Sequence, residues 1–218
     1  MRSIAKLMKD WQVTGPNGAT TAVELPHTWN AKDGQDGGND YWRGCCTYCT
    51  RFAAPVYDPA QQQVWLQFEG VNASAAVLLN GQQLCTHDGG YSTFRAEVTE
   101  LLQAENQLTV RVDNSVNDRV YPQKADFTFY GGIYRDVSLL VVNKNHIALG
   151  HFGDTGVKIT PTLKESSADI QVETLVEGSG TVTVELLDAE GRTAAKGEGE
   201  NTFLHLVAPH LWNGIKDP

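Results

Sequence analysis

Apolar and polar residues alternate with a period of two through most of the chain, and short clusters of Gly, Asn and Asp interrupt the alternation. Successive side chains of a β-strand point to opposite faces, so this period is typical of strands with one buried face. The segment at 62–70, for example, places Val64, Leu66 and Phe68 on one face. The regular spacing of the interruptions favours a β-sandwich over a parallel α/β sheet.

Local signals predict one hairpin and one short helical turn. Residues 75–86 form two strand-like halves joined at Asn80 and Gly81, a two-residue turn signal because both residues tolerate positive φ. In the segment 98–106, Thr99 precedes two leucines and is a candidate N-cap for a single helical turn. A further strand is expected at 106–115, with Leu108, Val110 and Val112 on one face.

A change of composition predicts a second domain. The segment 133–142 becomes continuously apolar, which indicates a strand covered on both faces. After Asn143, aromatic residues become rare, and Thr, Val and Glu alternate. We therefore predict two domains, at 1–145 and 146–218. Strands of the second are expected at 156–163, 168–177, 180–187, 192–198 and 201–207. An immunoglobulin-like sandwich has about seven strands, so we expect the second domain to be incomplete.

The composition is that of a folded, acidic protein. Hydrophobic residues make up 41% of the 218 residues and charged residues 20%, without long charge blocks. The formal net charge of -9 provides no basic field for a phosphate backbone or an anionic membrane, so neither nucleic acid nor a membrane is an expected partner. The N-terminal residues lack the apolar run of a secretory signal, and a cytoplasmic location is expected.

Four cysteines could pair or bind zinc, but their spacing favours buried or free thiols. Cys45, Cys46 and Cys49 crowd one strand-like segment, and Cys85 lies far from them in the sequence. The cluster lacks the second ligand pair that a zinc site requires. A disulfide or a metal site is the less favoured alternative.

Three segments, taken in order, resemble the sugar-binding jelly-roll domain of family 2 glycoside hydrolases. They are LPHTWNAKDGQDGGNDYWRGCCTYCTRF (25–52); FEGVN (68–72) with LNG (79–81) and HDGGYSTF (87–94); and DFTFYGGIYRDV (126–137), the most specific of the three. The resemblance is dense over 10–142 and looser to the end, where PHLWNGIKDP (209–218) is similar to the family's exit from its second domain. It implies an all-β fold: a galactose-binding-domain-like jelly-roll β-sandwich followed by an incomplete immunoglobulin-like β-sandwich.

The resemblance also implies a function. The family's β-galactosidase branch hydrolyses terminal β-galactosides with retention, which requires two carboxyl groups about 5 to 5.5 Å apart. In the family both are glutamates of a (β/α)8 barrel, and the acid/base follows an asparagine. No Asn-Glu dipeptide occurs in this sequence. The chain is therefore expected to be inactive alone, to shape the sugar pocket and to support the missing barrel. In the family the barrel holds most of the discrimination among galactoside, glucuronide and mannoside, and the full pattern of the first domain favours a β-galactoside.

The same resemblance indicates which cofactors and partners to expect. It implies no cofactor in this chain, and any magnesium or sodium of the parent enzyme would lie outside it. The expected partners are a β-galactoside and the missing barrel domain, and the pattern is compatible with a homo-oligomer.

Two aspartates are candidate substrate-binding residues. Asp126 matches, by resemblance, an acidic residue that reaches into the active-site pocket and accepts hydrogen bonds from sugar hydroxyls. A carboxylate suits this role because it offers several lone pairs to a vicinal diol. The alternative is a surface or loop-pinning carboxylate. Asp88 is the second candidate, against the interpretation that the glycines of its motif form a turn and Tyr91 packs at the edge of the core.

The remaining motif residues favour structural roles. His27 and Trp29 suggest a sugar-stacking platform, but Pro26 and the flanking turn favour a structural corner. Arg135 and the following Asp136 can pair locally. The acidic loop at 32–40 lacks the closing glutamate of an EF-hand, so a solvated loop that docks on the barrel is favoured over a calcium site. Its aspartates are Asp33, Asp36 and Asp40.

Two other classes of function remain open. A free-standing carbohydrate-binding module or lectin predicts a concave face lined with exposed Trp or Tyr and tight sugar binding without a partner. An adhesion or structural sandwich predicts no sugar contact, and the terminal Asp217-Pro218, just before the next expected strand, argues against it. An incomplete sandwich exposes strand edges, so we expect the chain to dimerise or its second domain to be partly loose.

Overall fold

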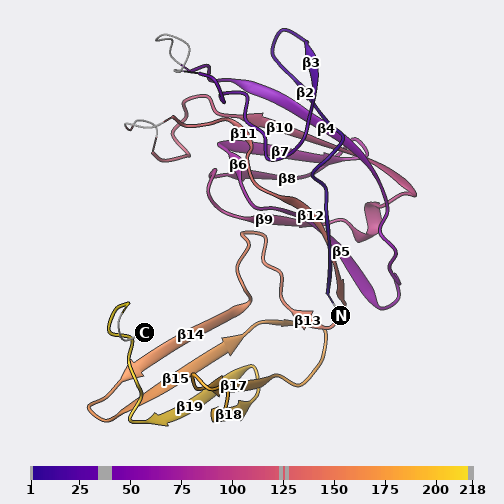
Figure 1. Cartoon of the computed structure of the whole chain (residues 1–218). Coiled ribbons are helices and arrows are strands. Elements are labelled where there is room, and N and C mark those ends of the chain that lie inside the picture. The colour runs from indigo at the N-terminus through magenta and orange to yellow at the C-terminus, as the bar shows by residue number, and fades with distance from the viewer. Residues whose placement is uncertain (1, 34–40, 123–124, 126–127, 216–218) are drawn as a thin grey trace. The chain divides into compact units, whose positions relative to one another are not determined.

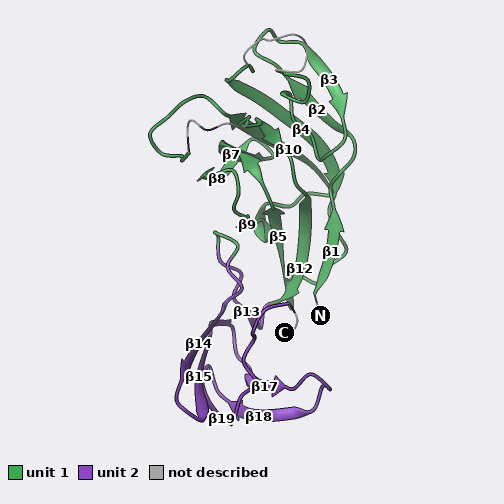
Figure 2. Ribbon diagram, turned by 60° about the vertical axis from the view of Figure 1, so that its left-hand side comes forward, with its two compact units in different colours: residues 1–143, 151–153 green, residues 144–150, 154–218 purple. Residues whose placement is uncertain are grey.

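The computed structural model describes residues 2–33, 41–122, 125 and 128–215 (Figure 1). Within these residues β-strands dominate, and the one helix is a 3-10 turn at Thr99–Leu101. The predicted all-β class is confirmed. No helix of the described part is long and apolar enough to cross a membrane. The chain divides into two compact units, residues 1–143 with 151–153 and residues 144–150 with 154–218 (Figure 2).

Unit 1 contains two antiparallel sheets. One has the strand order β1-β12-β5-β9, and the other has the order β3-β2-β4-β10-β7-β8. A third, two-stranded pair joins β6 to β11. The bounds are β1 Ser3–Lys6, β2 Trp11–Thr14, β3 Thr20–Val23, β4 Cys45–Ala53, β5 Gln62–Phe68, β6 Val71–Asn72, β7 Ser74–Leu79, β8 Gln82–Asp88, β9 Phe94–Glu97, β10 Glu105–Asp113, β11 Gly132–Ile133 and β12 Val137–Asn143. Neighbouring strands far apart in the sequence, such as β4 with β10, are the crossovers expected of a jelly roll.

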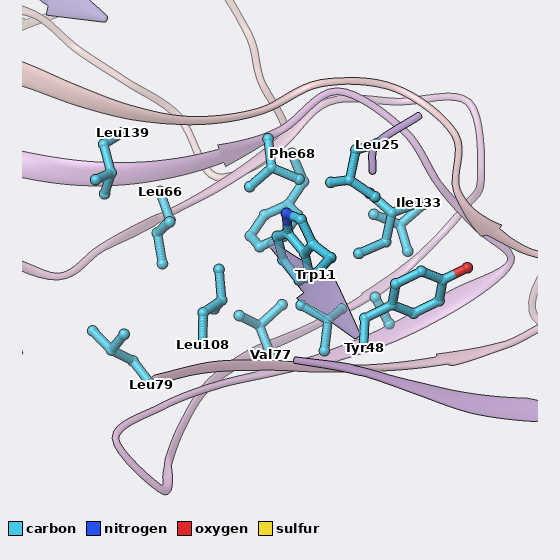
Figure 3. Packing of buried hydrophobic residues seen from close by; sticks show 14 of the residues in the cluster. Trp11, Leu25, Tyr48, Leu66, Phe68, Val77, Leu79, Leu108, Ile133 and Leu139 are labelled. Atoms are coloured by element: carbon cyan, nitrogen blue, oxygen red, sulfur yellow. The ribbon is translucent and has the colours of Figure 1, made fainter. Parts of the chain in front are cut away.

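The core of unit 1 lies between these two sheets. Figure 3 shows Leu66 and Leu139 from one sheet facing Val77 and Leu108 from the other. Burying such a side chain stabilises the fold by about 1.5 to 3 kcal/mol. The predicted inward-facing residues of β5 and β10 all have no exposed surface, which confirms the period-two prediction: Val64, Leu66, Phe68, Leu108, Val110 and Val112. The first six residues of β12 are all buried, so this strand is covered on both faces as predicted.

The hairpin prediction is confirmed, and the capping prediction is wrong. Strands β7 and β8 pair across a turn in which Asn80 and Gly81 both have positive φ. Thr99 is not the N-cap of the 3-10 turn, because Val98 occupies that position without a side-chain cap. Instead, the Thr99 hydroxyl accepts the backbone N–H of Val64 at 2.9 Å. The side chain therefore satisfies a donor of β5 rather than one of the helical turn.

The predicted strand at 133–142 is interrupted, and the expected local ion pair does not form. β11 ends at Ile133, and β12 begins only at Val137. Asp136 pairs with Lys6 at 2.5 Å, because β1 runs beside β12 and brings the lysine to it. Arg135 instead donates to the backbone oxygens of Glu69 and Tyr91. Partners from distant strands are thus preferred over the neighbour in sequence.

A buried histidine closes a stack of three rings in unit 1. Phe94 stacks on Phe68 at a centroid distance of 4.8 Å and on His87 at 4.3 Å. His87 is 4% exposed, and its Nε2 lies 3.1 Å from both Gly89 O and Ser92 Oγ. Its Nδ1 is buried without a hydrogen-bond partner. Burial, as the largest cause, lowers the pKa of His87.

This depressed pKa predicts that unit 1 loses stability in mild acid. Below the ordinary histidine pKa of about 6.5, the unfolded chain takes up a proton that folded His87 binds more weakly. Stability present above that pH is therefore lost as the pH falls, by at most about 1.4 kcal/mol per pH unit for each such histidine. His27, whose pKa burial also lowers, contributes in the same direction.

The substitution His87→Phe keeps a ring on Phe94 and removes one titrating group. We expect it to reduce the loss of stability between pH 7 and pH 5, with His27 responsible for part of the remainder. Urea midpoints measured across this range test the prediction. The nearby ring of His151 and the carboxylate of Asp88 are unchanged in the variant. Parallel pH profiles of variant and wild type would contradict the assignment.

Unit 2 has a three-stranded sheet, β14-β15-β19, a hairpin, β17-β18, and a short pair, β13-β16. The bounds are β13 His146–Ile147, β14 Val157–Leu163, β15 Ser167–Thr174, β16 Val176–Glu177, β17 Thr183–Leu187, β18 Thr193–Glu198 and β19 Asn201–Val207. Val172 and Leu204 are buried on one face of the larger sheet, but Ile159, opposite Val172 on β14, is 64% exposed. That face is only partly covered within the described residues.

Candidate functional site

Two loops of unit 1 meet at one end of the two central strands of the six-stranded sheet, β4 and β10. One loop, 24–44, leads into β4, and the other, 114–131, leaves β10. Cys45 at the start of β4 pairs with Asp113 at the end of β10, so the end of the first loop lies beside the beginning of the second. They contain the first part of the family-like segment 25–52 and the start of the segment 126–137. We call this region the loop end.

Asn30 ties the two loops together from inside. It has no exposed surface. Its Oδ1 accepts the backbone N–H of Gly131 at 2.7 Å, and its Nδ2 donates to Trp42 O at 2.7 Å and to Asp33 Oδ2 at 2.7 Å. One amide group therefore links two places in its own loop to Gly131, which is 101 positions away.

Asn114 completes this buried network. It is 2% exposed, and its Nδ2 donates to Phe129 O at 3.1 Å and to Asn30 Oδ1 at 3.3 Å. Its Oδ1 accepts the backbone N–H of Gly44 at 2.9 Å. Neither asparagine stands out in the sequence, since an asparagine beside a strand end is an ordinary turn residue. We call Asn30 and Asn114 the asparagine pair.

His27 and Trp29 contact the core rather than standing free. His27 Nδ1 lies 2.7 Å from the hydroxyl of Tyr48, which has no exposed surface. The backbone N–H of His27 donates to Ile133 O at 2.8 Å. The ring of Trp29 lies 6.4 Å from Tyr48 and 5.8 Å from Trp42. These are the contacts of a structural corner.

The first predicted site residue, Asp126, lies outside the described residues, as do Asp36 and Asp40 of the acidic loop. Asp33 is described, and its Oδ2 accepts the backbone N–H of Trp42 at 3.0 Å in addition to the Asn30 amide. Within the described ranges, no group of three or more His, Cys, Asp or Glu side chains is arranged to hold a metal ion.

The second predicted site residue, Asp88, holds the loop that contains Asp126. Its Oδ1 accepts from Ser74 Oγ at 2.5 Å, and its Oδ2 accepts from Arg119 Nε, within loop 114–131, at 2.9 Å. The pKa of Asp88 is lowered, chiefly by the hydrogen bond from Ser74 and further by the hydrogen bond and the charge of Arg119. The side chain is 40% exposed and lines a groove of about 370 Å³ with Arg111 and Arg119.

The turn after Asp88 differs from the prediction at Tyr91. This residue is 52% exposed, so it does not pack at the edge of the core. Gly90 closes the turn instead, because a Cβ there would lie 2.1 Å from Asn72 Oδ1. The hydroxyl of Tyr134 also donates to Gly90 O. Gly90 fixes the conformation of the turn, and the Tyr91 ring is exposed to solvent.

The outer face of the two central strands β4 and β10 is polar. Its outward residues are Cys45, Thr47, Cys49, Arg51, Ala53, Glu105, Gln107, Thr109, Arg111 and Asp113. These two strands, which are fully described, present no Trp or Tyr on that face, and a lectin-like platform would require one. All four cysteines are free thiols. Burial raises the pKa of Cys46 and of Cys85 to about 11, so both remain protonated at neutral pH.

Comparison with known proteins identifies the family to which this chain belongs. The model of the glycosyl hydrolase 2 galactose-binding domain-like family matches residues 38–163. The chain belongs to this family, and it is similar to both β-glucuronidases and β-galactosidases.

Three relatives illustrate the similarity. A β-glucuronidase of Bacteroides fragilis is 33% identical over 92% of this chain and 31% of its own length. A β-galactosidase of Thermoanaerobacter pseudethanolicus is 32% identical over 60% of this chain and 18% of its own length. The crystal structure of a putative β-galactosidase from Bacteroides fragilis superposes with a TM-score of 0.89 at 32% identity, covering 99% of this chain and 37% of that one. The chain thus spans about a third or less of the length of these proteins.

Proposed function

We propose that this chain is the non-catalytic part of a retaining β-glycosidase and that its loop end forms one wall of the sugar site. The single observation that carries the proposal is the convergence of the first and third family-like segments, 25–52 and 126–137, on the loop end, where the asparagine pair ties them together. A site on loops positioned by a rigid sandwich is the usual arrangement for binding residues. The complete enzyme is proposed to be cytoplasmic. A homo-oligomer is compatible with the proposal.

The carboxyl chemistry of the described residues supports a non-catalytic role. A retaining glycosidase needs a general acid whose pKa is raised, so that it holds a proton at neutral pH. Each described carboxyl group with a resolved shift has a lowered pKa. The leading causes are hydrogen bonds from Ser74 to Asp88, from His205 to Asp169 and from the Arg192 backbone to Asp188. A lowered pKa keeps these three groups ionised and unsuited to the general acid, and the resemblance to the family assigns both the acid and the nucleophile to a barrel elsewhere in the complete protein.

Asp126 is proposed to accept hydrogen bonds from the sugar hydroxyls. Its motif leads directly into Phe129 and Gly131, whose backbone groups the asparagine pair holds. Asp88 is the weaker candidate for substrate contact. Two of its lone pairs are taken by Ser74 and Arg119, and only its solvent-facing side is open.

The proposed substrate is a terminal β-galactoside, as the motif pattern of the first domain implies. A β-glucuronide is the second candidate, because the Bacteroides fragilis relative that matches 92% of this chain carries that name. In either case the proposed reaction is hydrolysis with retention at the anomeric carbon.

The test uses the complete protein with p-nitrophenyl β-D-galactoside, β-D-glucuronide and β-D-mannoside. We expect hydrolysis of the galactoside or the glucuronide. Asp126→Ala should lower kcat/KM about 10- to 100-fold, since a hydrogen bond to a charged group contributes roughly 1.5 to 3 kcal/mol. Glu165→Ala, which removes an exposed carboxylate of unit 2, is the matched control. Absence of hydrolysis would refute the function, and an unchanged kcat/KM in Asp126→Ala would refute the residue's role.

The rival proposal of a free-standing carbohydrate-binding module is disfavoured by the polar outer face of β4 and β10. One charged hydrogen bond contributes less than the roughly 4 kcal/mol that even millimolar affinity requires. Calorimetric titration of the 218-residue chain with galactose should therefore show no saturable binding below millimolar concentration. Micromolar binding would favour the module instead.

A further inference from the structure

Trp42 is an exposed aromatic residue within the loop end. Its side chain belongs to the family-like first segment, and 40% of its surface is open to solvent. A single exposed apolar side chain is ordinary on a protein surface, so the contacts that position this ring carry the argument.

The backbone of Trp42 is fixed on both sides by side chains. Its N–H donates to Asp33 Oδ2 at 3.0 Å, and its carbonyl accepts from Asn30 Nδ2 at 2.7 Å. Asn30 is fully buried, so this clamp is anchored in the interior of unit 1. The position of Trp42 is set by the same group that joins the two loops.

The indole ring is confined as well. A Cβ on Gly44 would lie 2.3 Å from Trp42 Cζ2, so the ring lies directly against the glycine backbone. The ring of Trp29 packs beside it at a centroid distance of 5.8 Å, tilted by 60°. One part of the indole is thus packed, and the remainder faces solvent in a fixed orientation.

Trp42 also lies close to the segment that follows Asp126. The Asn30 side chain binds Trp42 O with its nitrogen and the N–H of Gly131 with its oxygen, so one amide group separates the two backbones. The guanidinium of Arg43 lies over the ring of Phe129 at 5.2 Å, a second connection between the loops. The backbone of Trp42 therefore lies one side chain away from Gly131, at the end of the motif that the proposed function assigns to the sugar.

We propose that Trp42 is a stacking platform for the pyranose ring or the aglycone of the substrate, positioned by Asn30 and Asp33. This inference rests on the proposed function and adds a binding residue to it. A pyranose presents faces of C–H groups, and these pack on the electron-rich face of an indole. A ring already fixed in place loses little conformational entropy when it binds, so its contact area is converted efficiently into affinity.

The experiment compares Trp42→Ala, Trp42→Phe and Trp212→Ala in the complete protein. Trp212 is the matched control, since it is 74% exposed but lies in unit 2, outside the loop end. With p-nitrophenyl β-D-galactoside and β-D-glucuronide, Trp42→Ala should raise KM about tenfold and change kcat less than twofold. Trp42→Phe should recover most of the affinity, and Trp212→Ala should behave as wild type.

The clamp has its own readout. Asp33→Ala releases the N–H of Trp42 and should raise KM by a smaller factor, whereas Asp33→Asn keeps an acceptor oxygen and should restore it. A merely structural role would lower the Tm without this selective rescue of KM.

Two outcomes overturn the inference, and they are distinguishable. If the wild-type complete protein hydrolyses a β-glycoside but Trp42→Ala lowers only its Tm and leaves KM unchanged, the indole packs against another part of the protein and the proposed function stands. If the wild-type protein hydrolyses none of the glycosides, the proposed function fails, and the stacking role fails with it.

Discussion

Replacing Asn30 by Ala should lower the free energy of unfolding of unit 1 by about 2 to 4 kcal/mol. The substitution removes the acceptor for the N–H of Gly131 and the donor to Trp42 O and to Asp33. A buried polar group left without a partner costs about 1 to 3 kcal/mol. Gly131 is buried, so its N–H would stay without a partner, whereas the groups of Trp42 and Asp33 can hydrogen-bond to water in part. The loss of unfolding free energy is therefore smaller than three full penalties.

Urea unfolding, with probes that separate the transitions of the two units, measures this loss. Asn213→Ala is the control, since Asn213 is exposed in unit 2 and should change stability by less than about 0.5 kcal/mol. Asn30→Asp keeps the shape but places a carboxylate beside Asp33 Oδ2, so its loss at neutral pH should at least equal that of Asn30→Ala. A loss below 1 kcal/mol for both variants would mean that the asparagine pair does not hold the loops.

The second large effect is expected from Gly132→Ala at the start of β11. Gly132 has φ of +135°, a conformation that side chains rarely adopt, and a Cβ there would lie 2.4 Å from the backbone oxygen of His27. The Tyr48 hydroxyl is only 2.8 Å away from the same Cβ position. Neither neighbour can move easily, because His27 and the buried Tyr48 are hydrogen-bonded to each other. Backbone strain and overpacking, about 1 to 3 kcal/mol each, should together cost about 3 to 5 kcal/mol.

Gly199→Ala separates these two contributions. Gly199 has φ of +112°, but no atom lies within 4 Å of its Cβ position. It should therefore show the strain alone, about 1 to 3 kcal/mol. Urea denaturation of both variants gives the difference that the His27 and Tyr48 contacts cause. Equal losses for Gly132→Ala and Gly199→Ala would show that the corner around His27 yields to a methyl group.

The strands of unit 1 could be predicted from sequence because their signal is local. Alternation in β5 and β10 and the Asn80-Gly81 turn depend on residues that are neighbours along the chain. The same holds for the continuous apolar run that became the doubly covered β12. In these segments the burial follows directly from the order of the side chains.

Contacts between distant segments could not be predicted in this way. Thr99 looked like a helix cap, but its hydroxyl satisfies Val64, which lies 35 positions away. Arg135 and Asp136 looked like a local pair, but the carboxylate pairs with Lys6 of β1. A side chain pairs with whichever group lies beside it in the folded protein. A single sequence does not show which strands become neighbours.

The candidate site shows the same division. The motif containing Asp126 was recognisable from its resemblance to a family, yet the residues that hold the loops were not. Asn30 and Gly131 are 101 positions apart, and only the assembled sheets bring them within hydrogen-bond distance. Specificity is a further step away, since the relatives include both β-glucuronidases and β-galactosidases and we assign most of that choice to the barrel.

The most direct measurement is a turnover assay of the purified 218-residue chain with p-nitrophenyl β-D-galactoside and β-D-glucuronide. We predict release of p-nitrophenol no faster than in buffer, because the groups that cleave the glycosidic bond are assigned to a barrel that this chain does not contain. Turnover above the buffer rate that stays with the 218-residue chain through repeated purification would contradict the account.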